Sequence, residues 1–283
     1  MEQVLLNNGV KMPVEGFGVF QISDEAQCWQ CVLDALETGY RLFDTAAAYH
    51  NEQAVGRAVR ESGIPRDEIF ITTKLWVQDA GYDQTLAAFE RSRKNLGLDY
   101  IDLYLIHQPF GDYYGAWRAM EKLYREGIVK AIGVSNFSPE RIVDLCMNHE
   151  IKPAVNQIEI HPFYQQEEAL RIMRSYDIVP EAWGPLSEGQ KDIFHHRALQ
   201  KIAWRHEKTT AQVILRWHFQ RGIVTIPKTI HKERMKENID IWDFELTQKD
   251  MKEIEAMDIG HSEIIDHRCF CTARQLNSIK IHD

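Results

Sequence analysis

The sequence has few cysteines, no long apolar run and no excess of positive charge. Its five cysteines are odd in number and scattered, so we expect no disulfide framework and a reducing, cytoplasmic location. No stretch approaches the roughly 18 apolar residues of a membrane span. Near the start of the chain the only apolar run is Val4-Leu5-Leu6, which is too short for a secretion signal.

The charge balance argues against other classes of partner. The formal net charge is −9 over 283 residues, which disfavours nucleic acid or a membrane surface as a partner. Basic contacts to an anionic ligand must therefore be local. No Pro/Gly/Ser-rich linker or shift in composition divides the chain, so we expect one domain over 1–283, with the order of 261–283 left open.

A glycine fingerprint for dinucleotides is also missing. Gly16 and Gly18 lie in the first expected strand, but the third glycine of a G-x-G-x-x-G motif does not follow them. An open, doubly wound sheet would need that motif near its first strand. Its absence favours a closed barrel over the open sheet.

Strand-like and helix-like segments alternate along the chain. We expect strands at 16–20, 41–44, 69–74, 101–107, 130–135, 154–160, 178–183 and 223–226. We expect helices at 24–39, 51–61, 83–97, 113–126, 139–149, 166–176, 197–206 and 209–220. These repeated units predict an α/β fold, a (β/α)8 TIM barrel with a short C-terminal helical extension.

Local signals mark several of these boundaries. Asn8-Gly9 predicts the turn of an N-terminal β-hairpin. Ser138 before Pro139 is typical of a capped helix start, and Thr209 with Gln212 three residues later predicts a capping box.

Polar residues follow the expected strands at their C-terminal ends. In a barrel these ends form the mouth, where active sites lie. The polar residues at or near strand ends are Asp44, Lys74, His107, Ser135, Asn136, Gln157, Glu159 and Lys228. A buried charge needs a partner, so we expect these side chains to converge on one site.

Four residues of this region predict chemistry on a carbonyl group. A lysine beside a tyrosine lowers the tyrosine pKa from its reference value of about 10, and an aspartate beside the lysine keeps it charged. An imidazole at the next strand end donates to a carbonyl oxygen. Asp44, Tyr49, Lys74 and His107 thus predict a proton-donating site. Such a site needs a hydride from a second molecule, which indicates a nicotinamide cofactor, and we expect no metal.

Motifs in order along the chain resemble those of the aldo-keto reductase superfamily. They are Gly16–Phe20, Phe43–Ala46 with Tyr49 and Asn51-Glu52, Thr73–Trp76, Leu105–His107, Gly133–Phe137, Asn156–Glu159, Trp183–Leu186, and Ile226–Lys228 with Arg234 and Glu237-Asn238. The similarity is in register from about residue 4 to 260. The compact length looks most like the prokaryotic and protozoan reductases of the 2,5-diketogluconate reductase and prostaglandin F synthase type.

The resemblance implies NADPH-dependent reduction of an aldehyde or ketone to an alcohol, by a monomer or loose dimer. It implies that Tyr49 is the general acid, that Lys74 and Asp44 tune it, and that His107 orients the carbonyl. It also implies a set of cofactor contacts: Ser135, Asn136 and Gln157 at the nicotinamide carboxamide, Trp183 on its ring, Leu186 and Ser187 at the pyrophosphate, Lys228, Thr229 and Arg234 at the 2′-phosphate, and Glu237 and Asn238 at the adenine.

Physical chemistry agrees with the phosphate contacts. Lys228 and Arg234 flank an expected helix start, where backbone N–H groups and the helix dipole favour an anion. A basic pair at the mouth of an acidic protein favours NADPH over NADH. His231, however, stands where the family's phosphate motif usually has a hydroxyl residue.

The substrate pocket is less determined. We expect Phe20, Trp76 and Gln108 to line it, and Gln108 stands where many relatives have tryptophan, so the substrate stays open. The chain beyond Arg268 departs from the family's usual ending, which leaves closure of the mouth open.

Other patterns have alternative interpretations. Cys28-x-x-Cys31 has redox spacing but is expected to be an ordinary helix pair. His261, His267, Cys269 and Cys271 form a tail cluster in which zinc binding is the less favoured interpretation. The alternative to an enzyme is a cofactor-binding regulatory or structural protein without turnover. Because all four catalytic residues are present, the enzyme is favoured. A metal-dependent hydrolase would need converging ligands that the sequence lacks.

Overall fold

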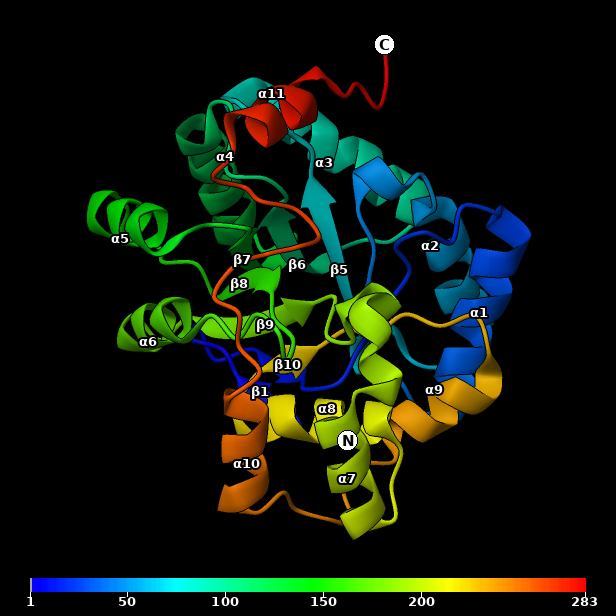
Figure 1. Cartoon of the computed structure of the whole chain (residues 1–283). Helices are drawn as coiled ribbons and strands as arrows, with labels where there is room; N and C mark the ends of the chain where they lie inside the picture. The colour runs from blue at the N-terminus through cyan, green and yellow to red at the C-terminus, as the bar shows by residue number, and fades with distance from the viewer. Residues whose placement is uncertain (1) are drawn as a thin grey trace.

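The computed structural model describes residues 2–283, in which a parallel sheet curves into a barrel with helices around it (Figure 1). Eight strands pair in chain order. They are β3 (Phe17–Gly18), β4 (Leu42–Asp44), β5 (Phe70–Leu75), β6 (Ile101–Ile106), β7 (Val129–Ser135), β8 (Val155–Glu159), β9 (Val179–Trp183) and β10 (Val224–Thr225). The (β/α)8 prediction is confirmed.

The first and last strands close the barrel through backbone hydrogen bonds. Gly16 N donates to Thr225 O at 2.7 Å, and Gly18 N donates to Pro227 O at 3.2 Å. A Cβ atom at Gly18 would lie 2.7 Å from Ile226 O, closer than real Cβ contacts. The closing seam therefore requires the absence of a side chain at Gly18.

Helices follow the strands as the sequence pattern predicts. They are α1 (Glu25–Thr38), α2 (Glu52–Glu61), α3 (Tyr82–Leu96), α4 (Tyr113–Arg125), α5 (Pro139–Asn148), α6 (Glu167–Ser175), α7 (Arg197–His206), α8 (Thr210–Gln220), α9 (Lys232–Ile239), α10 (Gln248–Glu255) and α11 (Phe270–Ser278). Short 3₁₀ segments are η1 (Ala47–Tyr49), η2 (Arg66–Glu68), η3 (Val77–Asp79) and η4 (Ser187–His195). Among residues 2–283 no helix combines the length and apolar character that crossing a membrane would require.

Two helix starts test the capping predictions. The capping box of Thr209 and Gln212 is present at α8. Ser138 occupies the N-cap position of α5, but its side chain accepts no hydrogen bond from the helix backbone, so that prediction is wrong in its detail. The start of α5 relies instead on Pro139 at the first helical position.

The barrel has two apolar layers. An inner cluster includes Leu42, Phe70 and Leu105 from the strands together with Leu6 and Met12. The latter two come from the N-terminal hairpin of β1 (Gln3–Leu5) and β2 (Lys11–Pro13), which packs on the barrel interior and confirms the hairpin prediction. A larger outer cluster joins strands to the surrounding helices.

On several strands the inward-facing residues, which alternate with outward-facing ones, change from apolar within the barrel to polar at the C-terminal end. Leu42 precedes Asp44 by two positions, Leu105 precedes His107, and Val155 precedes Gln157. Successive side chains of a strand point to opposite faces. The same face that fills the barrel interior therefore presents polar groups at the mouth.

The chain after α10 forms a tail that crosses the mouth. In Figure 1 this orange-to-red segment runs from α10 past the strands to α11, near α3 and α4. Ile259 N donates to Phe163 O at 2.9 Å, and Ser262 Oγ donates to the Glu159 carboxylate at 2.5 Å. The tail thus has structure of its own and is tied to the barrel at its start.

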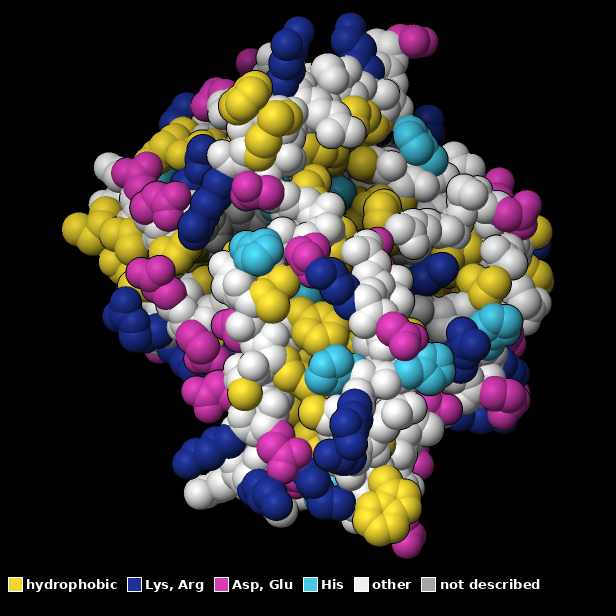
Figure 2. Space-filling view, in the orientation of Figure 1, with side chains coloured by type: hydrophobic (Ala, Val, Ile, Leu, Met, Phe, Trp, Pro, Cys, Tyr) yellow, Lys and Arg dark blue, Asp and Glu magenta, His cyan; other side chains and the backbone are white. Residues whose placement is uncertain are grey.

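Charged side chains of both signs are interspersed over the face seen in Figure 2. Histidines are visible near the middle of this face. Among residues 2–283 this face therefore carries no large patch of charge of one sign.

Candidate active site

The four residues predicted for catalysis meet at the mouth. Lys74, near the end of β5, has its Nζ in a salt bridge with the Asp44 carboxylate. The same Nζ donates to Thr45 O at 3.0 Å and to Tyr49 Oη at 3.4 Å. Tyr49 ends η1, so β4 and the segment after it supply all three groups around the ammonium.

Burial makes this ion pair unusual. The Lys74 residue is 0% exposed and Asp44 is 2% exposed. Burial by itself lowers the pKa of Lys74, but Asp44 and Tyr49 together hold that pKa above its ordinary value. Lys74 is therefore a cation at neutral pH. It is held in place by the Asp44 carboxylate, whose only buried charge partner among residues 2–283 is this ammonium.

The pKa of Tyr49 differs from the sequence prediction. Lys74 lowers it as expected, but burial raises it more, so the net pKa lies above the ordinary value for tyrosine. The prediction of a lowered pKa is wrong because it counted the cation and not the loss of solvent. Tyr49 is consequently a protonated phenol at neutral pH, the form that a proton donor needs.

His107 is a neutral imidazole. Burial, followed by the charge of Lys74 and the nearby His267, lowers its pKa well below the ordinary value. Its Nδ1 atom is buried without a hydrogen-bond partner among the described residues. Its ring packs edge-on to Tyr49 with centroids 5.5 Å apart.

Two predicted pocket residues form an aromatic wall beside these groups. The ring of Phe20 lies 4.9 Å from that of Tyr49, and the ring of Trp76 lies 5.2 Å from that of His107. Phe20 is 48% exposed and Trp76 only 5%. Phe20 therefore packs on Tyr49 at an exposed position, and Trp76 packs on His107 at a buried one.

The tail completes the wall. His267 Nε2 lies 2.9 Å from Gln108 Oε1, and Trp76 Nε1 donates to Ile279 O at 2.9 Å. The tail thus contacts two of the three predicted pocket residues. The sequence left this closure open, because no local pattern links positions so far apart in the chain.

Glu181 is a functional candidate that the sequence reasoning missed. It is 0% exposed, and Gln157 Nε2 donates both to its Oε2 at 3.0 Å and to Asp44 Oδ2 at 2.8 Å. Burial and the Asp44 carboxylate raise the pKa of Glu181 to about 8. The signal was available, since Glu181 stands two positions after inward-facing Val179, where the alternation places it inside the barrel.

The residues predicted to contact the nicotinamide carboxamide and ring lie next to the four residues predicted for catalysis. Asn136 Nδ2 donates to His107 O at 3.0 Å, and Trp183 Nε1 donates to Asn136 Oδ1 at 2.8 Å. Ser135 Oγ donates to Gln157 O at 2.8 Å. Ser135, Gln157 and Trp183 lie on β7, β8 and β9, and Asn136 directly follows β7. Gln157 is turned toward Asp44 and Glu181 beneath the mouth.

The residues predicted for the pyrophosphate lie in an irregular loop. Leu186 directly precedes η4. Ser187 is the first residue of η4 and has a positive φ of 52°. Glu188, Lys191 and Asp192 share the left-handed backbone. This backbone is rare for residues other than glycine.

The residues predicted for the 2′-phosphate surround the start of α9. Lys228 and Arg234 are exposed, and neither forms an ion pair with any of residues 2–283. Thr229 is buried, and its Oγ1 accepts from His231 N at 3.1 Å.

The two residues predicted for the adenine lie further along α9. Glu237 accepts from Thr209 Oγ1 at 2.7 Å, and Asn238 is buried. This helix packs on α1 and α8, so the α9 residues form a set separate from the catalytic four.

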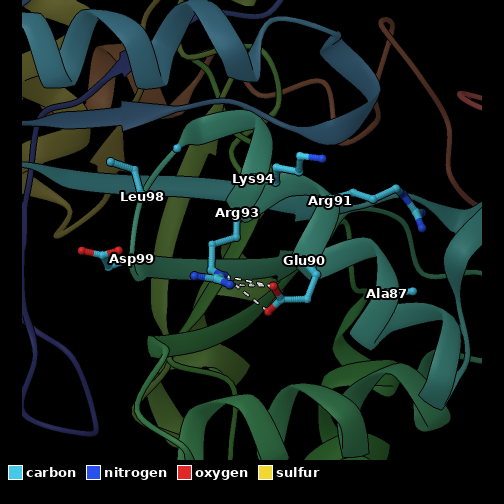
Figure 3. A pocket seen from close by; sticks show the side chains of 8 residues that line it. Ala87, Glu90, Arg91, Arg93, Lys94, Leu98 and Asp99 are labelled. Atoms are coloured by element: carbon cyan, nitrogen blue, oxygen red, sulfur yellow. Dashed lines mark hydrogen bonds and ion pairs between the residues drawn. The ribbon is translucent and has the colours of Figure 1, made fainter.

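A hollow beside α3 is distinct from this site. Figure 3 shows it, with a volume of about 530 Å³ and a lining that includes Ala87, Leu98 and Asp99. Arg93 pairs with Glu90, three residues earlier on α3, at 2.7 Å beside it. None of the residues predicted for catalysis or cofactor binding lines it.

The remaining candidate motifs have structural explanations. Cys28 and Cys31 are buried in α1, and burial raises the pKa of the Cys28 thiol to about 12, which confirms the interpretation as an ordinary helix pair. Over residues 2–283 no three His, Cys, Asp or Glu side chains are grouped so as to hold a metal ion.

A closed (β/α)8 barrel with a buried Lys–Asp pair, a protonated tyrosine and a neutral histidine at its mouth defines a barrel oxidoreductase acting on carbonyl or alcohol groups. The chain belongs to the Aldo/keto reductase family, which it matches over residues 16–259. The predicted resemblance and fold are thereby confirmed.

Curated relatives cover nearly the whole chain. The glyoxal reductase of Bacillus subtilis (strain 168) is 50% identical, over 90% of this chain and 92% of the relative. The 9,11-endoperoxide prostaglandin H2 reductase of Trypanosoma cruzi (strain CL Brener) is 48% identical, over 90% of each protein.

Solved structures agree with the fold. MGS-M4, an aldo-keto reductase enzyme from a Medee basin deep-sea metagenome library, superposes with a TM-score of 0.92 at 46% identity and covers 94% of this chain and 98% of its own. A Bombyx mori aldo-keto reductase in complex with NADP superposes at 0.89 with 35% identity and covers 94% and 95%. The chain is accordingly an oxidoreductase.

Proposed function

We propose that this protein is an NADPH-dependent carbonyl reductase that converts an aldehyde or ketone to an alcohol, with Tyr49 as the general acid. The observation that carries the proposal is the contact of Tyr49 Oη with the buried Lys74 ammonium, itself held by Asp44. In this arrangement the buried Tyr49 phenol keeps its proton at rest, and the Lys74 ammonium stabilises the phenolate that forms when the proton moves to a substrate.

In the proposed reaction the carbonyl oxygen lies between Tyr49 and His107. Tyr49 gives its phenolic proton to that oxygen, and Lys74 stabilises the phenolate that remains. His107 is neutral, so it orients the oxygen by donating one N–H without adding a second positive charge beside Lys74. When bound, the cofactor supplies the hydride.

The residues of this chain fit NADP(H). The family uses this cofactor. Lys228 and Arg234, which form no ion pair within residues 2–283, supply two cations at the start of α9, where backbone N–H groups also favour phosphate. We propose that they hold the 2′-phosphate with Thr229, and that Glu237 and Asn238 contact the adenine. Leu186 and Ser187 would line the pyrophosphate. Ser135, Asn136, Gln157 and Trp183 would surround the nicotinamide.

Replacing Tyr49 by phenylalanine tests the general acid. We expect Tyr49→Phe to bind NADPH as the native protein does but to lose nearly all carbonyl reduction, by about 10²-fold or more, because the proton donor is gone. Protein fluorescence titration measures binding, and NADPH absorbance measures turnover. Near-native turnover in this variant would overturn the assignment.

The substrate is best sought with a panel of compounds. Phe20, Trp76 and Gln108 are proposed to contact it, since all three border the catalytic residues or the tail. Because one relative is a glyoxal reductase, α-dicarbonyls belong in the panel with aldehydes, ketones and sugar-derived ketones. If none of these is reduced while NADPH binds, the alternative of a protein without turnover gains support.

We further propose a cytoplasmic protein that folds as one domain and works as a monomer or loose dimer with no nucleic-acid or membrane partner. The catalytic groups all come from one chain, so the site needs no second subunit. Size-exclusion chromatography with light scattering tests the oligomeric state.

A further inference from the structure

Cys269 and Cys271 form a pair of nucleophilic side chains outside the site described above. Their Sγ atoms lie 2.8 Å apart, and both are free thiols. Cys271 is exposed and Cys269 is partly exposed. The other three cysteines are buried, namely Cys28, Cys31 and Cys146. A reagent in solution therefore reaches this pair first.

The two thiols are not equivalent. Cys269 is the N-cap of α11, and its sulfur accepts from Cys271 N at 3.3 Å and lies in contact with the Cys271 sulfur. The contact with the Cys271 side chain and hydrogen bonds from the Thr272 and Cys271 backbone lower the pKa of Cys269, whereas the contact with Cys269 raises the pKa of Cys271. One sulfur is thus prepared to attack as a thiolate, and a second stands beside it.

We propose that Cys269 and Cys271 are a thiol–disulfide exchange site that closes an intramolecular disulfide by reaction with a small disulfide such as oxidised glutathione. The Cys269 thiolate attacks one glutathione sulfur, forms a mixed disulfide and releases the other half as a thiolate. That thiolate takes the proton of Cys271. The Cys271 sulfur then attacks Cys269, and the second glutathione leaves as a thiolate that is protonated by water. Two cysteine sulfurs are oxidised and two glutathione sulfurs are reduced.

The location of the pair connects it to the mouth. His267, two residues before Cys269, is hydrogen bonded to Gln108, and Ile279, directly after α11, accepts from Trp76. Closing the disulfide changes the Cys269 sulfur that caps α11 into a disulfide sulfur. The redox state should therefore alter the position of α11 and with it substrate binding. This coupling rests on the proposed carbonyl reductase function, whereas the disulfide itself does not.

Mass spectrometry of the full chain tests the disulfide. The reduced protein is incubated in mixtures of reduced and oxidised glutathione, free thiols are alkylated, and the tail peptide is weighed. We expect a peptide lighter by two hydrogen atoms whose disulfide is reopened by dithiothreitol. A lasting glutathione adduct, a disulfide between two chains, or unchanged thiols under strongly oxidising conditions would overturn the proposal.

Single variants test the order of attack. Cys271→Ser should stop at a glutathione adduct on Cys269, whereas Cys269→Ser should react more slowly because the favoured thiolate is missing. Cys146→Ser is the matched control and should behave as the native protein does. Equal alkylation rates of the remaining tail thiol in the two variants would contradict the role of Cys269.

Kinetics test the coupling. We expect KM for an accepted aldehyde to differ by about twofold or more between the reduced and oxidised forms, and not at all in the Cys269→Ser/Cys271→Ser double variant. An unchanged KM would overturn the coupling to substrate binding but would not contradict the disulfide itself. Absence of turnover in the reduced protein counts instead against the proposed function, and the mass measurement is unaffected by it.

Discussion

At the scale of the residue, two buried carboxyl groups, Asp44 and Glu181, lie close to the same buried cation, Lys74. Asp44 takes Lys74 as its partner, and Gln157 joins Asp44 to Glu181 through one amide group. Glu181 Oε1 is buried with no hydrogen-bond partner among the described residues. A carboxyl group in this position is most stable when it keeps its proton, because a second buried anion would face Asp44 without a counter-ion.

The raised pKa of Glu181 predicts a pH dependence of stability. The folded value is about 8 and the unfolded value about 4.3, so between them the folded state holds a proton that the unfolded state lacks. This contribution is fully present below about pH 4.3 and is lost as the pH rises through about 8, with a slope of at most about 1.4 kcal/mol per pH unit.

Glu181→Gln should remove this slope. Relative to the native protein, the free energy of unfolding of the variant should increase steadily from about pH 5 to pH 8, because glutamine has no proton to lose. Urea unfolding at several pH values measures the difference, and exposed Glu150→Gln is the control. A constant difference between Glu181→Gln and native protein across this range would contradict the buried titration.

At the scale of the element, α9 presents a helix start suited to an anion. Its N-cap, His231, makes no side-chain hydrogen bond to the helix, so the first backbone N–H groups receive no cap from it. Lys232 pairs with Asp34 and Glu37, whereas Lys228 and Arg234 form no ion pair within residues 2–283. The helix thus has two cations without acidic partners near a positive dipole end.

Arg234→Ala tests the phosphate contact. The dissociation constant for NADPH should rise by about tenfold or more, since a charge-assisted hydrogen bond contributes about 1.5–3 kcal/mol. The constant for NADH should change little, because it has no 2′-phosphate. Fluorescence quenching measures both, and Lys236→Ala, which removes a cation of the same helix paired with Glu233, is the control. Equal losses for the two cofactors would rule out the role.

At the scale of the whole molecule, the tail joins opposite sides of the mouth. It begins after α10 and ends against η3, where Gln78 Nε2 donates to His282 O and Gln78 Oε1 accepts from Ile281 N. Gln78 lies outside the catalytic set, so the end of the tail is held without using a reacting group. The tail therefore shapes the pocket through His267 and Ile279, while Gln78 holds its last residues.

Gln78→Ala should loosen this attachment. Losing two hydrogen bonds of about 0.5–1.5 kcal/mol each makes local opening roughly tenfold more frequent. Hydrogen exchange in α11 should accelerate while exchange in the strands stays the same. Gln53→Ala, at an exposed glutamine of α2, is the matched control. Unchanged exchange in α11 would show that other contacts hold the tail.

The sequence by itself determined the barrel and most of the mouth. Alternating strand and helix patterns and their order are local properties of the chain, and the end of each strand must face the same opening. For this reason Asp44, Lys74 and His107 could be assigned to one site without a structure. Glu181 follows the same alternation and was available to the same reasoning.

Only the tertiary structure decided the remaining features. The pKa of Tyr49 depends on the balance between burial and the Lys74 charge, and the degree of burial is set by segments distant in the chain. The contact of His267 with Gln108 joins positions 159 residues apart, so no local pattern predicts it. Reaction type therefore follows from the order of residues, whereas protonation and closure of the pocket follow from distances in space.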